Sequence, residues 1–175
     1  MSGLPASLQS TSVAERSPRR WSAGDLVALI APFAVGALGS IPTARAIPSW
    51  YRTLDKPSWN PPDRLFGPVW TALYGLMGLA LVLIRRQPRD SRTDRAQAVF
   101  GLQLSFNLAW SFVFFGNRSL RGGLVVIGLL WVAIVATIAE FWRLKPSAAL
   151  LLVPYLAWVS FASILNADVA RRNGA

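Results

Sequence analysis

Five long apolar stretches constrain this 175-residue chain more than any other feature of its sequence. They cover about residues 26–46, 66–84, 96–115, 124–142 and 148–167. An α-helix needs roughly 20 residues to cross roughly 30 Å of hydrocarbon, and each stretch approaches that length. Charged residues make up 15% of the chain and gather between the stretches, as expected when a bilayer excludes charge. The sequence therefore predicts an all-α integral membrane protein, a bundle of five transmembrane helices.

Short polar connections separate most of these stretches, so neighbouring helices are expected to be antiparallel within one domain over residues 23–170. The longest connection is residues 47–65. Residues 1–22 are rich in Ser, Pro and Arg and have no apolar period, which predicts a disordered basic tail. A second short tail is expected at residues 171–175.

The first apolar stretch has an alternative interpretation. Arg20 precedes it, and residues 44–46 end it with the small-x-small pattern of a cleaved signal peptide. Pro32, Gly36 and Gly39 instead favour a retained helix that packs closely against its neighbours through small residues.

Two residue types are absent, and their absence excludes several kinds of chemistry. Without His or Cys the chain forms no Ser-His-Asp relay, no thiolate or imidazole metal site and no disulfide. A haem would lack its commonest axial ligands, leaving a Met such as Met77, or a Tyr, as a conceivable donor. The net charge of +10 lies beside apolar segments, which favours anionic lipid headgroups over nucleic acid as its counterions.

The loop at residues 50–62 contains three aromatic residues and three prolines at the expected membrane surface. Trp and Tyr anchor many membrane proteins at the interface without binding anything. Proline also restricts the conformations of a loop, so the same segment could form a preorganised lid over a cavity. The residues alone leave both interpretations open.

Three of the expected helices place aromatic and polar side chains on one face. In hydrocarbon a buried amide needs a partner, either another helix or a ligand. Apolar walls with a few polar groups are typical of a ligand pocket. The three faces are Phe66, Trp70, Leu73, Tyr74 and Met77; Gln103, Asn107, Trp110 and Phe114; and Tyr155, Trp158, Ala162 and Asn166.

These motifs resemble, in order and spacing, the tryptophan-rich sensory protein and translocator protein (TspO/MBR) family. The matching segments are Trp50-Tyr51-x-x-Leu54-x-Lys56-Pro57-x-Trp59-Asn60-Pro61-Pro62, Phe66-x-x-Val69-Trp70-x-x-Leu73-Tyr74, Gln103-Leu104-x-x-Asn107-x-x-Trp110 and Pro154-Tyr155-x-x-Trp158. The resemblance covers about residues 26–167. It implies a five-helix bundle, usually a homodimer, with a pocket beneath the first loop for porphyrin, haem or other flat hydrophobic molecules.

The resemblance also implies particular site residues. The ligand-binding candidates are Tyr51, Trp59, Trp70, Asn107, Trp110, Tyr155, Trp158 and Ala162. In the family, the matches to Trp70 and Trp158 are associated with light-dependent breakdown of protoporphyrin. The cholesterol motif of mammalian members has a central Tyr, and Ala167 stands at its place here, so cholesterol recognition by that route is not expected.

The function expected from these observations is a membrane tetrapyrrole-binding protein that senses or regulates tetrapyrrole metabolism or stress responses. Light-dependent porphyrin degradation by an enzyme is one alternative, and transport of a porphyrin or sterol is another. The expected partners are a tetrapyrrole, the lipid bilayer and a second copy of the chain, and no nucleic acid. No obligatory cofactor and no metal site is expected.

Overall fold

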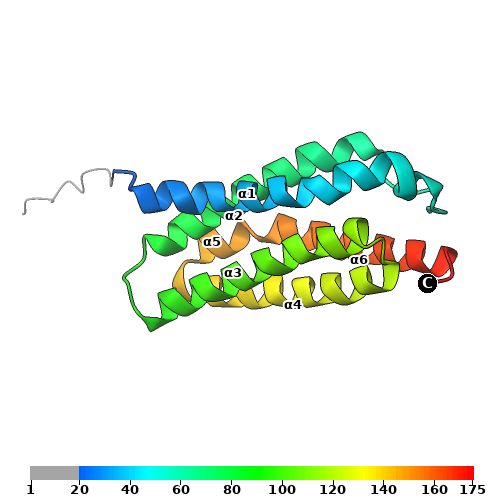
Figure 1. Ribbon diagram of the computed structural model, residues 1–175. Coiled ribbons are helices and arrows are strands. Elements are labelled where there is room, and N and C mark those ends of the chain that lie inside the picture. The colour runs from blue at the N-terminus through cyan, green and yellow to red at the C-terminus, as the bar shows by residue number, and fades with distance from the viewer. Residues whose placement is uncertain (1–19) are drawn as a thin grey trace, which may run out of the picture.

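The computed structural model describes residues 20–175, and in that part five helical spans each run antiparallel to the span before (Figure 1). All five are long and apolar enough to cross a membrane, which confirms the predicted fold class. Most of the predicted tail lies outside the described residues. The elements are α1 (Ala23–Ala46) continued by the π-helical turn η1 (Ile47–Tyr51), the 3₁₀ turn η2 (Asp63–Leu65) leading into α2 (Phe66–Arg85), α3 (Ser91–Ser111) continued by the π-helical turn η3 (Phe112–Gly116), α4 (Leu120–Leu144), and a fifth span formed by α5 (Pro146–Leu150) and α6 (Val153–Arg172).

Side-chain caps set where several helices begin. Ser22 and Asp25 form a capping box at the start of α1, and the Asp90 carboxylate accepts from the Thr93 backbone amide at 2.8 Å at the start of α3. As a result α3 begins at Ser91, five residues before the apolar stretch that predicted it. The first turns of this helix are polar but helical, so hydropathy alone placed its start too late.

The fifth span breaks where the sequence predicts one continuous helix over 148–167. α5 ends at Leu150, and α6 begins at Val153 with Pro154 in its first turn. Proline has no backbone N–H to donate to the preceding turn, which disfavours a continuous helix through this point.

The spans form two close pairs, α1 with α2 and α3 with α4, and α6 packs against α4 (Figure 1). Gly78 permits the close approach of α1 and α2, because a Cβ there would lie 2.5 Å from the Leu29 carbonyl oxygen. Between the pairs lies an apolar core that includes the stacked rings of Phe100 and Phe141, 5.8 Å apart. α1 therefore packs as an integral part of the bundle, which favours the retained helix over a cleaved signal peptide.

Large apolar side chains also cover the outside of the bundle. Val27, Val125, Val132 and Ile164 are each more than 60% exposed. A water-soluble domain of this size would expose large contiguous apolar patches only at a binding surface, whereas lipid is a suitable solvent for all of these residues. The protein is a multi-pass integral membrane protein.

Candidate functional site

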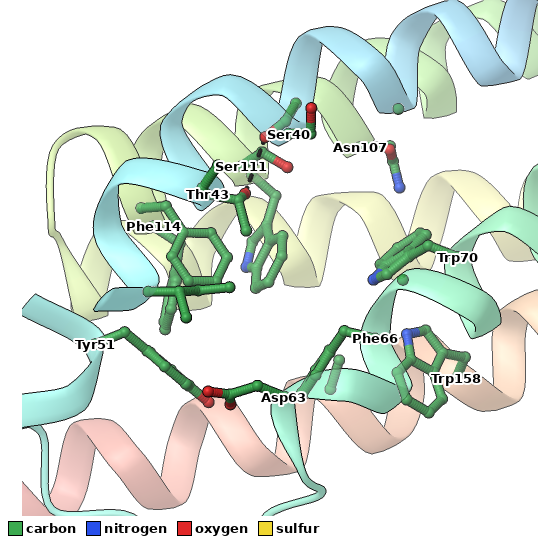
Figure 2. A pocket seen from close by; sticks show the side chains of 18 of the residues that line it. Ser40, Thr43, Tyr51, Asp63, Phe66, Trp70, Asn107, Ser111, Phe114 and Trp158 are labelled. Atoms are coloured by element: carbon green, nitrogen blue, oxygen red, sulfur yellow. Dashed lines mark hydrogen bonds between the residues drawn. The ribbon is translucent and has the colours of Figure 1, made fainter. Parts of the chain in front are cut away.

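A cavity of about 460 Å³ lies between α1, α2, the α3–η3 segment and α6 (Figure 2). Its volume falls within the range of pockets that hold small organic molecules. The lining residues from α1 and η1 are small or hydroxylated for the most part, and the other elements supply most of the aromatic side chains. The residues used below are Gly36, Ser40, Thr43, Tyr51, Asp63, Phe66, Trp70, Tyr74, Asn107, Trp110, Ser111, Phe114, Trp158, Ala162 and Asn166.

Stacked and edge-to-face aromatic rings form the walls. On α2 the Trp70 ring stacks on Tyr74 at 5.4 Å, and on the α3–η3 segment Trp110 stacks on Phe114 at 5.1 Å. Trp158 of α6 meets the edge of Phe66 at 5.9 Å. Each ring is fixed by a neighbour, so the cavity presents preformed π surfaces to an occupant.

Asn107 joins three helices at one end of the cavity. Its Oδ1 accepts from the Tyr74 hydroxyl of α2 at 3.2 Å, and its Nδ2 donates to the Tyr155 hydroxyl of α6 at 3.0 Å. The residue is 3% exposed, so both atoms need such partners. Asn107 therefore serves as an interhelical bridge as well as part of the pocket wall.

The α1 wall is thin, and the cavity reaches the outside of the bundle there. A Cβ on Gly36 would lie 2.2 Å from the Tyr74 ring, so only glycine lets that ring take its place. Ser40 and Ala44 of α1, and Gly67 and Thr71 of α2, line the cavity and are themselves exposed. Because these residues lie within the spans, the cavity opens sideways between α1 and α2 toward the lipid.

The first loop closes one end of the cavity around Tyr51. Lys56 donates to the Tyr51 and Leu54 carbonyl oxygens at 2.7 and 3.2 Å, and its ammonium lies 4.8 Å from the centre of the Tyr51 ring. The Tyr51 hydroxyl donates to Asn60 at 3.1 Å. Asn173, beyond α6, fixes the same loop by pairing with the Asp55 backbone twice, at 3.1 and 2.9 Å. The loop is thus held as a cover, in addition to any anchoring role in the interface.

Six of the eight residues predicted as ligand contacts lie in the cavity wall, and two lie beside it. Tyr155 is fully buried behind the wall, against the edge of the Trp70 ring at 6.1 Å. Trp59 is 44% exposed and packs against Phe161, outside the lining. The six that line the cavity are Tyr51, Trp70, Asn107, Trp110, Trp158 and Ala162.

The sequence reasoning missed three contributions to the site. The α1 wall was expected only to pack, although its cluster of small residues also leaves room for the cavity. Asp63 lies at the exposed rim, where Figure 2 shows its carboxylate beside Tyr51. Because it precedes α2, it belongs to no helical face, and periodicity could not identify it. Asn166 was placed on the aromatic face of the fifth helix but was not predicted as a ligand contact.

The cavity offers little for acid–base or metal chemistry. Among the lining residues within 20–175, Asp63 is the single charged side chain. No group of three or more carboxylate, imidazole or thiol side chains that could hold a metal occurs in the described part of the chain. Met77 is fully buried away from the lining, with its sulfur 3.9 Å from Gln103 Nε2. The site is suited to bind a flat apolar molecule by stacking and packing.

Comparison with known proteins agrees with this architecture. The sequence model of the TspO/MBR family matches residues 28–172. The chain is 48% identical over 141 residues to the tryptophan-rich protein TspO of Chlorobaculum tepidum, covering 80% of this chain and 89% of that one. It is 42% identical over 127 residues to the human translocator protein (71% and 75%), and 40% identical over 124 residues to the tryptophan-rich sensory protein of Cereibacter sphaeroides (71% and 77%). With the matched segment spanning all five helices and the whole cavity, the chain belongs to the TspO/MBR family.

Proposed function

We propose that this protein binds a tetrapyrrole, either a porphyrin or haem, in the cavity and acts as a sensory or regulatory protein of tetrapyrrole metabolism or stress response. One observation carries the proposal: the indole rings of Trp70, Trp110 and Trp158 line one cavity of about 460 Å³ between four spans. Flat π surfaces in a largely apolar cavity favour a flat aromatic ligand. That a relative is named a sensory protein supports the sensory part.

The chemistry of the lining indicates how such a ligand would be held. The chain has no His or Cys, and Met77 lies outside the cavity. A haem would therefore be held by stacking on the indoles, with no strong axial ligand from the protein. The opening between α1 and α2 would admit an apolar ligand directly from the bilayer. The homodimer implied by the family resemblance stays a prediction.

The test is a titration of protoporphyrin IX into the purified protein in the dark, followed by the shift of the porphyrin absorbance band. We expect saturable binding by the parent and loss of saturation in a Trp70→Ala, Trp158→Ala double variant. Trp142→Ala is the matched control, because Trp142 is 52% exposed on α4 and outside the cavity. Equal affinity in the parent and the double variant would refute the proposal.

A second candidate function, light-dependent porphyrin breakdown, rests on the same indoles. A porphyrin stacked on Trp70 or Trp158 would be in van der Waals contact with an oxidisable ring. Illuminating the dark-titrated samples in the presence of oxygen tests it. Bleaching faster with the parent than with the double variant or with empty detergent micelles would support an enzyme, and equal rates would leave a binding protein.

A further inference from the structure

A second pocket, of about 340 Å³, lies where the end of α1 meets η3, close to the ends of the first and third spans. Its α1 residues recur at i, i+1, i+4 and i+5, so they share one face of that helix. Of the described residues, Phe115 alone lines both this pocket and the aromatic cavity. The lining residues are Ile41, Pro42, Arg45 and Ala46 of α1, and Phe112, Phe115, Gly116, Asn117 and Arg118 of η3 and the turn after it.

The apolar side of this pocket faces the lipid. α1 and η3 pack closely at its base, because a Cβ on Gly116 would lie only 3.6 Å from the Cβ of Pro42, which is buried. About one turn further into the spans, Ile41 and Phe112 are 49% and 45% exposed. Apolar side chains exposed at that depth are suited to contact acyl chains.

Two arginines form the polar side. Arg45 and Arg118 are exposed, and neither guanidinium makes a hydrogen bond or an ion pair within residues 20–175. The exposed side chain of Asn117 also has no hydrogen-bond partner in that part of the chain. None of the lining residues in the described chain is a carboxylate. The pocket therefore holds two positive charges without a counter-charge from the protein.

Arg118 has a backbone conformation that is rare for a residue with a side chain. Its φ is 52°, the only positive φ of a non-glycine residue in the described chain. The tight turn here joins η3 to α4, whose N-cap Ser119 follows directly. Glycine or asparagine would fit this conformation with less strain, and strained positions of this kind occur often at functional sites. The strain thus draws attention to the arginine side chain at this position.

A phosphate group in the headgroup region complements the two arginines. The guanidinium group presents parallel N–H donors that pair with two phosphate oxygens, and the Asn117 amide would add another donor. Arg45 lies near the end of the first span, from where a long charged side chain reaches the headgroups. A phospholipid places its phosphate at that level and its acyl chains deeper, beside Ile41 and Phe112. A zwitterionic lipid also carries a cation, which the arginines would repel.

We propose that this pocket binds one anionic phospholipid, with its phosphate between Arg45 and Arg118 and an acyl chain against Ile41 and Phe112. Both arginines lie outside the aromatic cavity, so the inference goes beyond the proposed function and does not rest on it. A lipid bound there would tie the end of α1 to the connection between α3 and α4.

The test is a titration of the purified protein in neutral detergent with phosphatidylglycerol or phosphatidylcholine, followed by native mass spectrometry, which counts the bound lipids. We expect the parent to bind one phosphatidylglycerol about tenfold more tightly than phosphatidylcholine. The double variant Arg45→Gln, Arg118→Gln should bind phosphatidylglycerol about tenfold more weakly than the parent, because it loses the charge-assisted hydrogen bonds to the phosphate. Unchanged affinity in this variant would overturn the proposal.

The double variant Arg52→Gln, Arg121→Gln is the matched control. Arg52 follows η1 and Arg121 lies in the first turn of α4, so both are near the same end of the bundle. Both are exposed and outside the pocket, and neither has a hydrogen bond or an ion pair within the part of the chain that the structure describes. The control removes the same number of charges and should keep the parent's affinity. Equal weakening in the two double variants would overturn the proposal, because net charge alone would then explain the binding.

Two further measurements separate the remaining explanations. Arg45→Lys, Arg118→Lys keeps both charges but loses the paired donors, so it should bind several-fold more weakly, and it also serves as the test if the Gln variant does not fold. Release of the bound lipid by excess inorganic phosphate would overturn lipid recognition and indicate a site for free phosphate. The Gln variant should bind protoporphyrin IX as the parent does, so the tetrapyrrole function and this inference can fail independently.

Discussion

Replacing Asn107 by Leu tests whether its amide holds the bundle together. The change is nearly isosteric, and it removes the 3.2 Å bond from Tyr74 and the 3.0 Å bond to Tyr155. Hydrogen bonds between membrane helices contribute about 0.6 kcal/mol on average and up to about 1.7 kcal/mol each. Tyr155 is fully buried and would keep an unpaired hydroxyl, so its bond should lie at the upper end. We expect a total loss of about 2 kcal/mol in the free energy of unfolding.

The assay is unfolding in mixed micelles of increasing SDS fraction, followed by circular dichroism, for the parent, Asn107→Leu, Tyr155→Phe and the double variant. The double-mutant cycle should give a coupling of about 1 kcal/mol between Asn107 and Tyr155. The same cycle with Tyr74→Phe should give less, because Tyr74 lines the cavity and is less deeply buried than Tyr155. Stability of Asn107→Leu within about 0.5 kcal/mol of the parent would refute the bridging role.

Three further predictions concern other parts of the molecule. Gly78→Ala should destabilise the bundle by about 2 kcal/mol or more in the same assay, because its Cβ meets the Leu29 backbone, whereas Gly75→Ala, whose Cβ would lie 3.7 Å from Phe33, should be neutral or slightly stabilising. Asn173→Ala removes both bonds to the Asp55 backbone and should speed dissociation of bound porphyrin several-fold in a displacement experiment, whereas unchanged dissociation would contradict a covering role for the loop. The Thr93 backbone amide lowers the pKa of Asp90 below its ordinary 3.8, so the stabilising effect of this cap should be complete above that pH and fade as the pH falls below it. Tm measured against pH should therefore fall in acid for the parent, and the difference from Asp90→Ala should shrink there.

Hydropathy was sufficient to predict five spans because the thickness of the bilayer fixes how long an apolar stretch must be. It could not place the helix ends, which depend on local bonds. The Asp90 cap starts α3 within a polar segment, and Pro154 interrupts the fifth span within an apolar one. Hydropathy also gives no indication of the π-helical turns at the ends of α1 and α3.

Helical periodicity placed Trp70, Asn107 and Trp158 toward one interior, and the structure brings them to one cavity. Periodicity fails for Trp59, since a loop has no repeating faces. Periodicity also fails to separate Tyr155 from Trp158, because the two residues lie about one turn apart on the same helical face. Trp158 lines the cavity, whereas Tyr155 is buried behind its wall.

The Asn107 bridge suggests how a membrane bundle can keep an open aromatic cavity. Lipid is as apolar as the side chains, so hydrophobic burial does little to hold helices together, and close packing and interhelical hydrogen bonds must do so. Here Gly78 and the Asn107 bridge supply both, and neither requires an occupant in the cavity. Trp70 and Trp158 are then free to face a ligand, because the helices that carry them are already fixed. It follows that Trp70→Ala and Trp158→Ala should impair binding much more than folding, whereas Asn107→Leu should do the reverse.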